Sequence, residues 1–465
     1  MSRFRPRISR GVESLPPPPA VAVIPRVTPP AKLPVRPTDP PVPQLNIGQR
    51  LGFLILCAYM ISGVLNEWSL RLLGIKAFLS TITLVLLPVF WLASGAGLRG
   101  LRHSIGVWWA AFLFLLVIAT PFSIWPGGSA QVLFDYVPRG YMLLFYVAAL
   151  TISFRNCRHL MYVNIATSFL ALSICVRFGV TADDGRYMVP GGAGFFQNSN
   201  ELALALLLGI THFAYLLSQK NRVGKVIAVG GIALSAPFIL WTGSRGCVIA
   251  AAAYACLLLF LSRQRLRAVV LIAALAGVGV LFAPSAVLHR ITLLTGDEEI
   301  TSSADASAVA SQMSRISLLK RSVAETIAHP LFGVGPGQFP VAVMEQAKAK
   351  NEWFQWLGTH NSYTQISSEC GIPAFICYLV VIILCLKLNF ALWRRTRNRP
   401  DQADIMKLSV ALLSGSVVYA VGSFFFHMAY TGTLPFIAGQ TLALHFASKQ
   451  NHQQSGDDKP ILSRA

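Results

Sequence analysis

The chain has 465 residues, of which 54% are hydrophobic and only 12% charged, and its mean hydropathy is +0.57. A soluble domain carries about 25% charged residues, so this composition excludes an ordinary soluble protein and indicates a membrane protein. The formal net charge is +20, from 39 Lys and Arg against 19 Asp and Glu. Such a balance is typical of nucleic-acid binding or of contact with an anionic membrane, and the positions of the charges decide between them.

Residues 1–48 precede the first apolar segment and are rich in proline, including the run at 16–19. Proline favours extended, unpacked conformations, so we expect a disordered cytoplasmic tail. This polar lead is too long for a cleavable signal peptide, which predicts that the first apolar segment is retained. The tail is either a solvated tether or a docking segment for a cytoplasmic partner.

Apolar segments follow, each long enough to cross a hydrocarbon core of about 30 Å. We expect an all-α, polytopic integral membrane protein with about twelve transmembrane helices between residues 49 and 447. The predicted segments are 51–67, 74–95, 106–125, 138–154, 160–178, 200–218, 226–243, 246–262, 268–285, 366–388, 408–426 and 429–447.

The basic residues predict the orientation of these segments, because short cytoplasmic loops are enriched in Lys and Arg. Basic clusters fall in every second connection, which places both termini, including the short tail 448–465, in the cytoplasm. The clusters are Arg99 and Arg102; Arg155 and Arg158; Lys220, Arg222 and Lys225; Arg263, Arg265 and Arg267; and Arg394, Arg395, Arg397 and Arg399. Membrane topology therefore accounts for most of the positive charge, and no nucleic-acid partner is needed.

One connection, residues 286–365, is far longer than the about 15 residues beyond which loops are usually functional or disordered. The orientation places this loop outside the cytoplasm. Residues 314–328 show near-helical spacing, with Ile316, Leu319, Val323 and Ile327 on one face. The sequence His329-Pro330 ends this pattern, since proline disfavours helix at the preceding residue. We expect a partly helical external subdomain.

Ionisable side chains are nearly absent from the centres of the predicted spans. Ion-coupled transporters place such groups near the membrane midplane, and His212 is the sole candidate here. The outward-facing ionisable residues are instead Arg139, Arg186, Arg245, Arg290, Arg315, Arg321 and His360. This distribution favours an enzyme at the outer face over a solute transporter, which remains the alternative from another class.

Three predicted helices start at the outer surface with distinctive polar sequences. These are Gln197-Asn198-Ser199-Asn200-Glu201, Thr242-Gly243-Ser244-Arg245-Gly246 and Thr359-His360-Asn361-Ser362-Tyr363. Helix N-terminal amides bind anions, and an adjacent arginine suits a phosphate. Simple N-capping by Asn or Ser is the competing interpretation.

No metal site is predicted. The eight cysteines show no CxxC or Cys/His ligand spacing, and no disulfide framework is indicated. The outer loops contain no DxD motif, because Asp183 and Asp184 are adjacent and are read as turn residues. We expect no cofactor.

Four of these strings together resemble the successive signatures of the O-antigen ligase and Wzy-type polymerase family. They lie in order between about residues 190 and 375: Phe196-Gln197-Asn198-Ser199-Asn200-Glu201-Leu202-Ala203; Thr242-Gly243-Ser244-Arg245-Gly246; Arg315 ahead of His329-Pro330-Leu331-Phe332-Gly333-Val334-Gly335; and His360-Asn361-Ser362-Tyr363 through Glu369-Cys370-Gly371. The chain departs from the family pattern at Gln197, where a small residue is more usual.

The resemblance implies a metal-independent GT-C glycosyltransferase that takes a glycan from an undecaprenyl-pyrophosphate carrier at the periplasmic face of the bacterial inner membrane. It implies that His360 activates the acceptor hydroxyl, and its near-neutral pKa suits that role. Arg245 and Arg315 would bind the pyrophosphate. Asn200, Asn361 and Glu369 would position the sugar or hold His360.

The family includes enzymes with different acceptors. We expect a polymerase that joins lipid-linked repeat units of an exopolysaccharide or O-antigen. The alternatives are an O-antigen ligase that transfers glycan to lipid A core and an enzyme that glycosylates protein. The long proline-rich extension favours the polymerase, because a multi-component polysaccharide export system has a use for such a segment.

Overall fold

The computed structural model describes residues 46–74, 78–182, 185–191, 196, 198–262, 264–266, 269–270, 273–274, 277, 303–351 and 356–457. Nearly all of the predicted proline-rich tail lies outside these residues, as do Asp183, Asp184, Gln197 and Arg290. Most of the predicted span 268–285 also lies outside them, and so do residues 286–302 and 352–355 of the long loop.

The described chain is almost entirely helical. Its α-helices are α1 (Ile47–Leu73), α2 (Leu79–Ala93), α3 (Ser104–Ala119), α4 (Pro126–Tyr136), α5 (Leu143–Leu150), α6 (Phe154–Phe178), α7 (Ser199–Leu217), α8 (Arg222–Trp241), α9 (Arg245–Leu261), α12 (Ser303–Ala328), α13 (Phe339–Ala349), α14 (Ser362–Thr396), α15 (Ala403–Gly422) and α16 (Thr433–Asp457). Short 3-10 turns lie at Gly97–Arg102 and Pro400–Gln402. The hairpin β1 (Val180–Thr181) and β2 (Tyr187–Met188) is antiparallel, with Val180 opposite Met188.

The apolar helices confirm an all-α membrane protein. Six helices in the described residues are long and apolar enough to cross a membrane, and α2, α3 and α9 are shorter apolar helices. The six are Ile47–Leu73, Phe154–Phe178, Ser199–Leu217, Arg222–Trp241, Ser362–Thr396 and Pro400–Gly422. The chain is thus a multi-pass membrane protein, and the count of twelve spans with its orientation stays a prediction.

The predicted span 138–154 is not one continuous helix. It is preceded by α4 and broken by a π turn at Val137–Tyr141, in which the Met142 N–H donates to the Val137 carbonyl. Pro138 has no N–H for the helical ladder, which accounts for a local rearrangement at this point. Arg139 in this turn lies 3.7 Å from Asp135, and both side chains are largely exposed.

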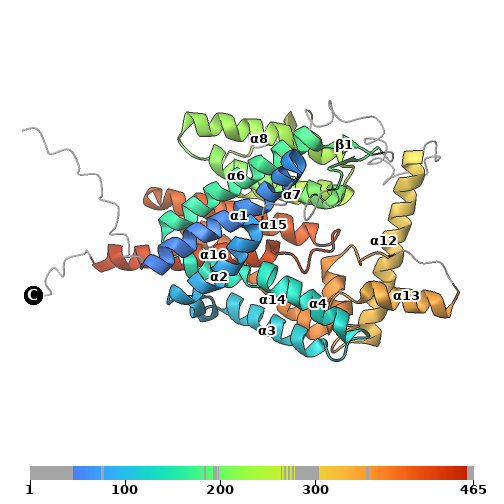
Figure 1. Ribbon diagram of the computed structural model, residues 1–465. Helices are drawn as coiled ribbons and strands as arrows, with labels where there is room; N and C mark the ends of the chain where they lie inside the picture. The colour runs from blue at the N-terminus through green and yellow to red at the C-terminus, as the bar shows by residue number, and fades with distance from the viewer. Residues whose placement is uncertain are drawn as a thin grey trace, which may run out of the picture. The chain divides into compact units, whose positions relative to one another are not determined.

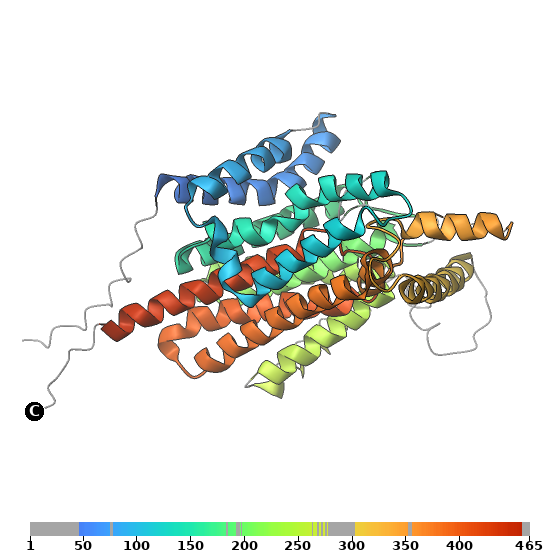
Figure 2. The same cartoon turned by 90° about the horizontal axis from the view of Figure 1, so that it is seen from below.

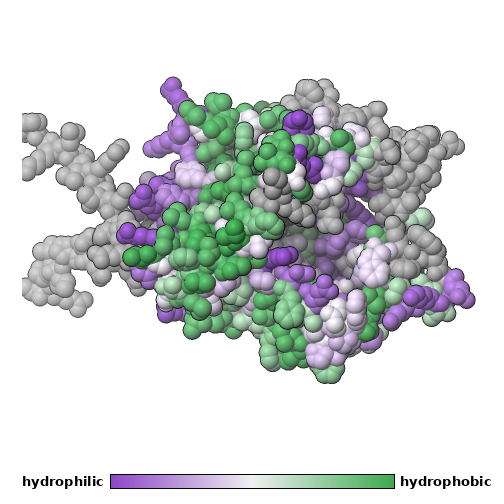
Figure 3. Space-filling view, viewed as in Figure 1, coloured by the Kyte–Doolittle hydropathy of each residue, from purple (hydrophilic) through white to green (hydrophobic). Residues whose placement is uncertain are grey.

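The core of the bundle is aromatic where α3, α14 and α15 meet. Trp109, Phe112, Tyr378 and Tyr419 are fully buried there. The Tyr378 and Tyr419 hydroxyls are 2.6 Å apart, so the buried polar atoms satisfy each other. On the outside, Figure 3 shows apolar side chains over the helical bundle and polar side chains toward its ends. Such a large exposed apolar surface is typical of contact with lipid.

The two ends of the bundle differ. Figure 1 places the β1–β2 hairpin, α12 and α13 at the end opposite the C-terminal end of α16, and Figure 2 shows the same separation from below. The three polar strings lie at the starts of α7, α9 and α14. These starts are at the end of the bundle that carries the hairpin and α12, as the contacts below show.

Candidate active site

Two histidines from separate parts of the chain meet before α14. The His360 ring lies 5.0 Å from the His427 ring, edge to face at 82°. His360 has a left-handed backbone (φ 50°) immediately before Asn361, and His427 lies in the connection between α15 and α16. Left-handed backbone is uncommon for a non-glycine residue and often marks a functional site.

The α15–α16 connection is tied to the start of α14 by hydrogen bonds around one serine. The Ser362 N–H donates to the Ser423 carbonyl at 2.7 Å. The Ser362 hydroxyl donates to the Phe426 carbonyl at 2.6 Å and accepts from the Met428 N–H at 2.9 Å. These bonds bracket His427 and fix it relative to His360, two residues before Ser362.

Arginine side chains lie close enough to His360 to shift its protonation. The pKa of His360 is lowered to about 4, first by burial and then by His427, Arg315 and Arg186. Each of these four residues belongs to a different segment, so the fold brings them to one place. Because a low pKa favours the neutral imidazole, His360 is uncharged at neutral pH and can accept a proton.

Arg186 connects two of the helix starts. Its Nε donates to the Thr242 carbonyl and one terminal nitrogen donates to Asn200 Oδ1, both at 2.8 Å. The residue follows the turn of the β1–β2 hairpin and links the start of α7 to the α8–α9 turn. The sequence placed Arg186 among the outward-facing arginines but gave it no role, because no motif includes it.

The start of α9 differs from the other two polar helix starts. Asn198 caps α7 by accepting from the Asn200 and Glu201 N–H groups, and Asn361 caps α14 by accepting from Tyr363 and Thr364. The capping interpretation therefore holds for α7 and α14. Ser244 precedes α9 without a side-chain cap bond, and its buried hydroxyl has no hydrogen-bond partner among the described residues.

Arg245, the first residue of α9, adjoins the histidine segment. A Cβ on the next residue, Gly246, would lie 2.4 Å from Phe425 Cβ, so glycine is required for α9 to approach the α15–α16 connection. Phe425 is two residues before His427. The predicted residues Arg245, Arg315 and His360 therefore lie on segments that adjoin one another at one end of the bundle.

Glu369 holds the loop that follows α12. Its carboxylate accepts from the Gly337 N–H at 2.9 Å, and also from the Phe339 N–H and the Tyr430 hydroxyl. The residue is 3% exposed. Glu369 and the cap Asn361 thus have positioning contacts with the backbone, and the described structure contains no bond from either side chain to the His360 ring.

The loop after α12 lies against a break in helix α14. At Gly371 the backbone leaves the helix (φ 82°, ψ 171°), and the Ser368 and Glu369 carbonyls accept instead from Val334 and Gly335. A Cβ on Gly371 would lie 2.2 Å from the Leu331 carbonyl oxygen. Glycine at position 371 therefore has a structural reason, since it has a left-handed backbone and a close neighbour.

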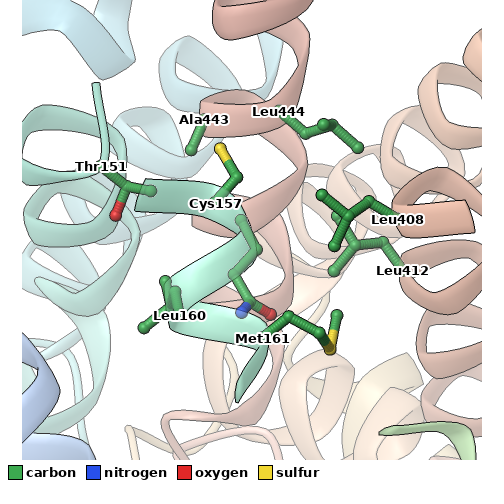
Figure 4. Close-up of a pocket in the computed structure, with 9 residues that line it drawn as sticks. Thr151, Cys157, Leu160, Met161, Leu408, Leu412, Ala443 and Leu444 are labelled. Carbon is green, nitrogen blue, oxygen red and sulfur yellow. The ribbon is translucent and has the colours of Figure 1, made fainter. Parts of the chain in front are cut away.

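A small packing defect lies elsewhere, between α6, α15 and α16 (Figure 4). Apolar side chains such as Leu160, Met161 and Leu412 dominate its lining, and it includes none of the predicted site residues. Within the described ranges, no group of three or more His, Cys, Asp or Glu side chains is arranged to hold a metal ion.

These features define a multi-pass helical membrane protein with a histidine and arginine site at one end of its bundle. Residues 230–379 match the family model for O-antigen ligase. The match over these residues supports the resemblance to the O-antigen ligase and Wzy family that the motifs predicted. A comparison of the chain with curated proteins gave no match. The matched region contains Arg245, Arg315 and His360, whereas Arg186 and His427 lie outside it.

Proposed function

We propose that this chain is a periplasmic-face glycosyltransferase of the bacterial inner membrane, which transfers a glycan from an undecaprenyl-pyrophosphate carrier to an acceptor hydroxyl. The observation that carries the proposal is the grouping of Arg186, Arg315 and His427 around a neutral, partly buried His360. The family match supports glycan transfer at a membrane.

The cationic groups suit a pyrophosphate leaving group. As the bond between the anomeric carbon and the phosphate oxygen breaks, negative charge grows on that oxygen and is stabilised by preorganised donors. Arg315 and Arg245 supply guanidinium groups, which bind phosphate in a bidentate manner. The start of α9 adds backbone N–H groups and the Ser244 hydroxyl, which has no hydrogen-bond partner among the described residues and so favours a ligand there.

His360 is the proposed base. The acceptor oxygen attacks the anomeric carbon, the carbon–oxygen bond to the pyrophosphate breaks with its electrons, and the acceptor proton passes to His360. A histidine with a pKa near 4 is a weak base. The donor's negative charge offsets Arg315 and Arg186, which are two of the causes of the low pKa, so donor binding raises the basicity of His360 when it is needed.

The acceptor that we propose is a second lipid-linked repeat unit, which makes the enzyme a polymerase of exopolysaccharide or O-antigen. The proline-rich extension at 1–48 supports contact with other polysaccharide export components. Transfer to lipid A core, as by a ligase, is the alternative. Deletion of the gene separates the two: single repeat units without long chains are expected, whereas full-length chains left on the carrier would identify a ligase.

Purified variants in vesicles supplied with lipid-linked oligosaccharide test the site. We expect His360→Ala and Arg245→Ala to lower transfer by at least about 100-fold, the usual size of a general base or an electrostatic contribution. The controls are His329→Ala and Arg139→Ala, which alter exposed side chains that pair with Glu325 and Asp135. Full transfer by His360→Ala at normal protein level would refute the mechanism.

A further inference from the structure

Helix α12 exposes the apolar face that its sequence predicts. Ile316, Leu319, Val323 and Ile327 are each between 41% and 74% exposed. The opposite side, with Leu318, Ser322 and Glu325, is buried against the rest of the protein. The helix therefore packs through its more polar side. We call the four exposed residues the apolar face of α12.

The helix lies across the end of the bundle. Figure 1 and Figure 2 show α12 crossing the ends of the long helices and not running alongside them. Near its C-terminal end, the Thr326 hydroxyl is 2.8 Å from the Ser367 hydroxyl in the polar first turns of α14. The apolar run of α14 starts shortly afterwards, at Ile372. This contact places α12 at the level where α14 passes from polar to apolar sequence.

Exposed apolar residues continue past the end of α12 toward the end of α3. Leu331, three residues after the end of α12, is 62% exposed. The next residue, Phe332, stacks on Phe122 with ring centroids 4.5 Å apart. Phe122 and Trp125 are exposed and follow directly after α3. Aromatic residues at the end of a membrane helix are typical of the lipid–water interface.

The charge on the exposed side of α12 fits a phospholipid surface. Between residues 313 and 328, Lys320 is the one charged side chain that is fully on the surface. Arg315 and Arg321 are half-buried, and the acidic residue Glu325 is buried. A lysine beside an apolar stripe extends its ammonium toward lipid phosphates while its methylene groups stay in the apolar layer.

We propose that α12 is an interfacial helix whose apolar face rests in the outer-leaflet phospholipid layer of the membrane that the bundle spans. Helices of this kind lie in the membrane plane with their apolar face about 5–10 Å into the headgroup boundary. Arg315 lies on the adjoining side of α12 and acts on His360. The placement therefore holds Arg315 at the depth of the lipid headgroups. If the proposed function holds, on which this step rests, the pyrophosphate of the donor lies at the same depth.

Spin labels on the full-length protein in vesicles of phosphatidylethanolamine and phosphatidylglycerol test this placement. Ile316→Cys and Val323→Cys label the apolar face, and Ser317→Cys and Ala328→Cys are matched controls on the exposed flank of the same helix. Cys57 and Cys256 are replaced by serine, since the remaining cysteines are buried. Collision with oxygen reports lipid, and collision with a water-soluble nickel chelate reports solvent.

We expect the ratio of oxygen to nickel collisions to be severalfold higher at positions 316 and 323 than at 317 and 328. Equal ratios would overturn the proposal, because the face would then be in water. Low collision with both reagents at 316 and 323 would also overturn it, since protein would then cover the face. The measurement uses vesicles without donor, so its failure is distinct from failure of the proposed transfer reaction.

Discussion

Substitution of Glu369 separates a positioning role from a chemical one. Its buried carboxylate accepts from two backbone N–H groups, at Gly337 and Phe339, and from the Tyr430 hydroxyl. In Glu369→Ala both N–H groups lose their acceptor, at about 1–3 kcal/mol each, so we expect the free energy of unfolding to fall by about 2–6 kcal/mol. Glu369→Gln keeps an acceptor oxygen and loses about 1 kcal/mol, the difference between a charged and a neutral acceptor.

The assay pairs the thermal unfolding midpoint of each purified variant with its rate of transfer from lipid-linked oligosaccharide. Glu369→Gln is expected to keep a near-normal midpoint and measurable transfer, and Glu369→Ala to lose both. Complete loss of transfer in Glu369→Gln at a normal midpoint would refute the positioning role, because only the charge has changed. A normal midpoint in Glu369→Ala would show that the loop does not depend on this carboxylate.

Three further outcomes are expected. The value of kcat/KM should decrease at acid pH with a midpoint of about pH 4, because transfer needs neutral His360 and protonation removes the base. A midpoint near pH 6.5 would contradict the lowered pKa of His360. Gly371→Ala should lower the free energy of unfolding by about 3 kcal/mol or more, because the backbone would be strained and the new Cβ would overlap Leu331. The control is Gly63→Ala, where the new Cβ meets open space, and its thermal unfolding should be nearly unchanged. Ser244→Ala should raise KM for the donor severalfold at unchanged stability, since the Ser244 hydroxyl bonds to no side chain or backbone group in the part of the chain that the structure describes. An unchanged KM would exclude it from the phosphate site.

Hydropathy was sufficient to predict most of the helices. For example, the predicted segments 200–218 and 246–262 agree within one residue with Ser199–Leu217 and Arg245–Leu261. The break in 138–154 was not predicted, because apolar content does not report how a proline is accommodated in the hydrogen-bond ladder. The sequence did place four apolar residues on one face of α12. Which side of an amphipathic helix meets protein depends on its partner, and here the partner contacts the polar side.

Only part of the candidate site could be predicted. Local strings singled out Arg315 and His360 as candidate residues, and the fold brings Arg315 close enough to lower the pKa of His360, while their roles stay predictions. His427 was missed because it lies between two apolar segments in no recognisable pattern. Arg186 was seen as an outward-facing charge, but its bonds to Asn200 and Thr242 join segments far apart in the chain. Such long-range contacts leave no local signal in one sequence.

The short first part of α14, residues 362–370, carries contacts that position the candidate site residues, and it lies in the same motif as His360. His360 precedes it, and Ser362 within it holds the segment that carries His427. At its other end, Thr326 of α12 and the loop after α12 bind to Ser367, Ser368 and Glu369. The same nine residues therefore set the position of both histidines and of the helix that carries Arg315. The break at Gly371 makes this possible, because a continuous helix would use the Ser368 carbonyl for its own ladder and leave the loop without an acceptor.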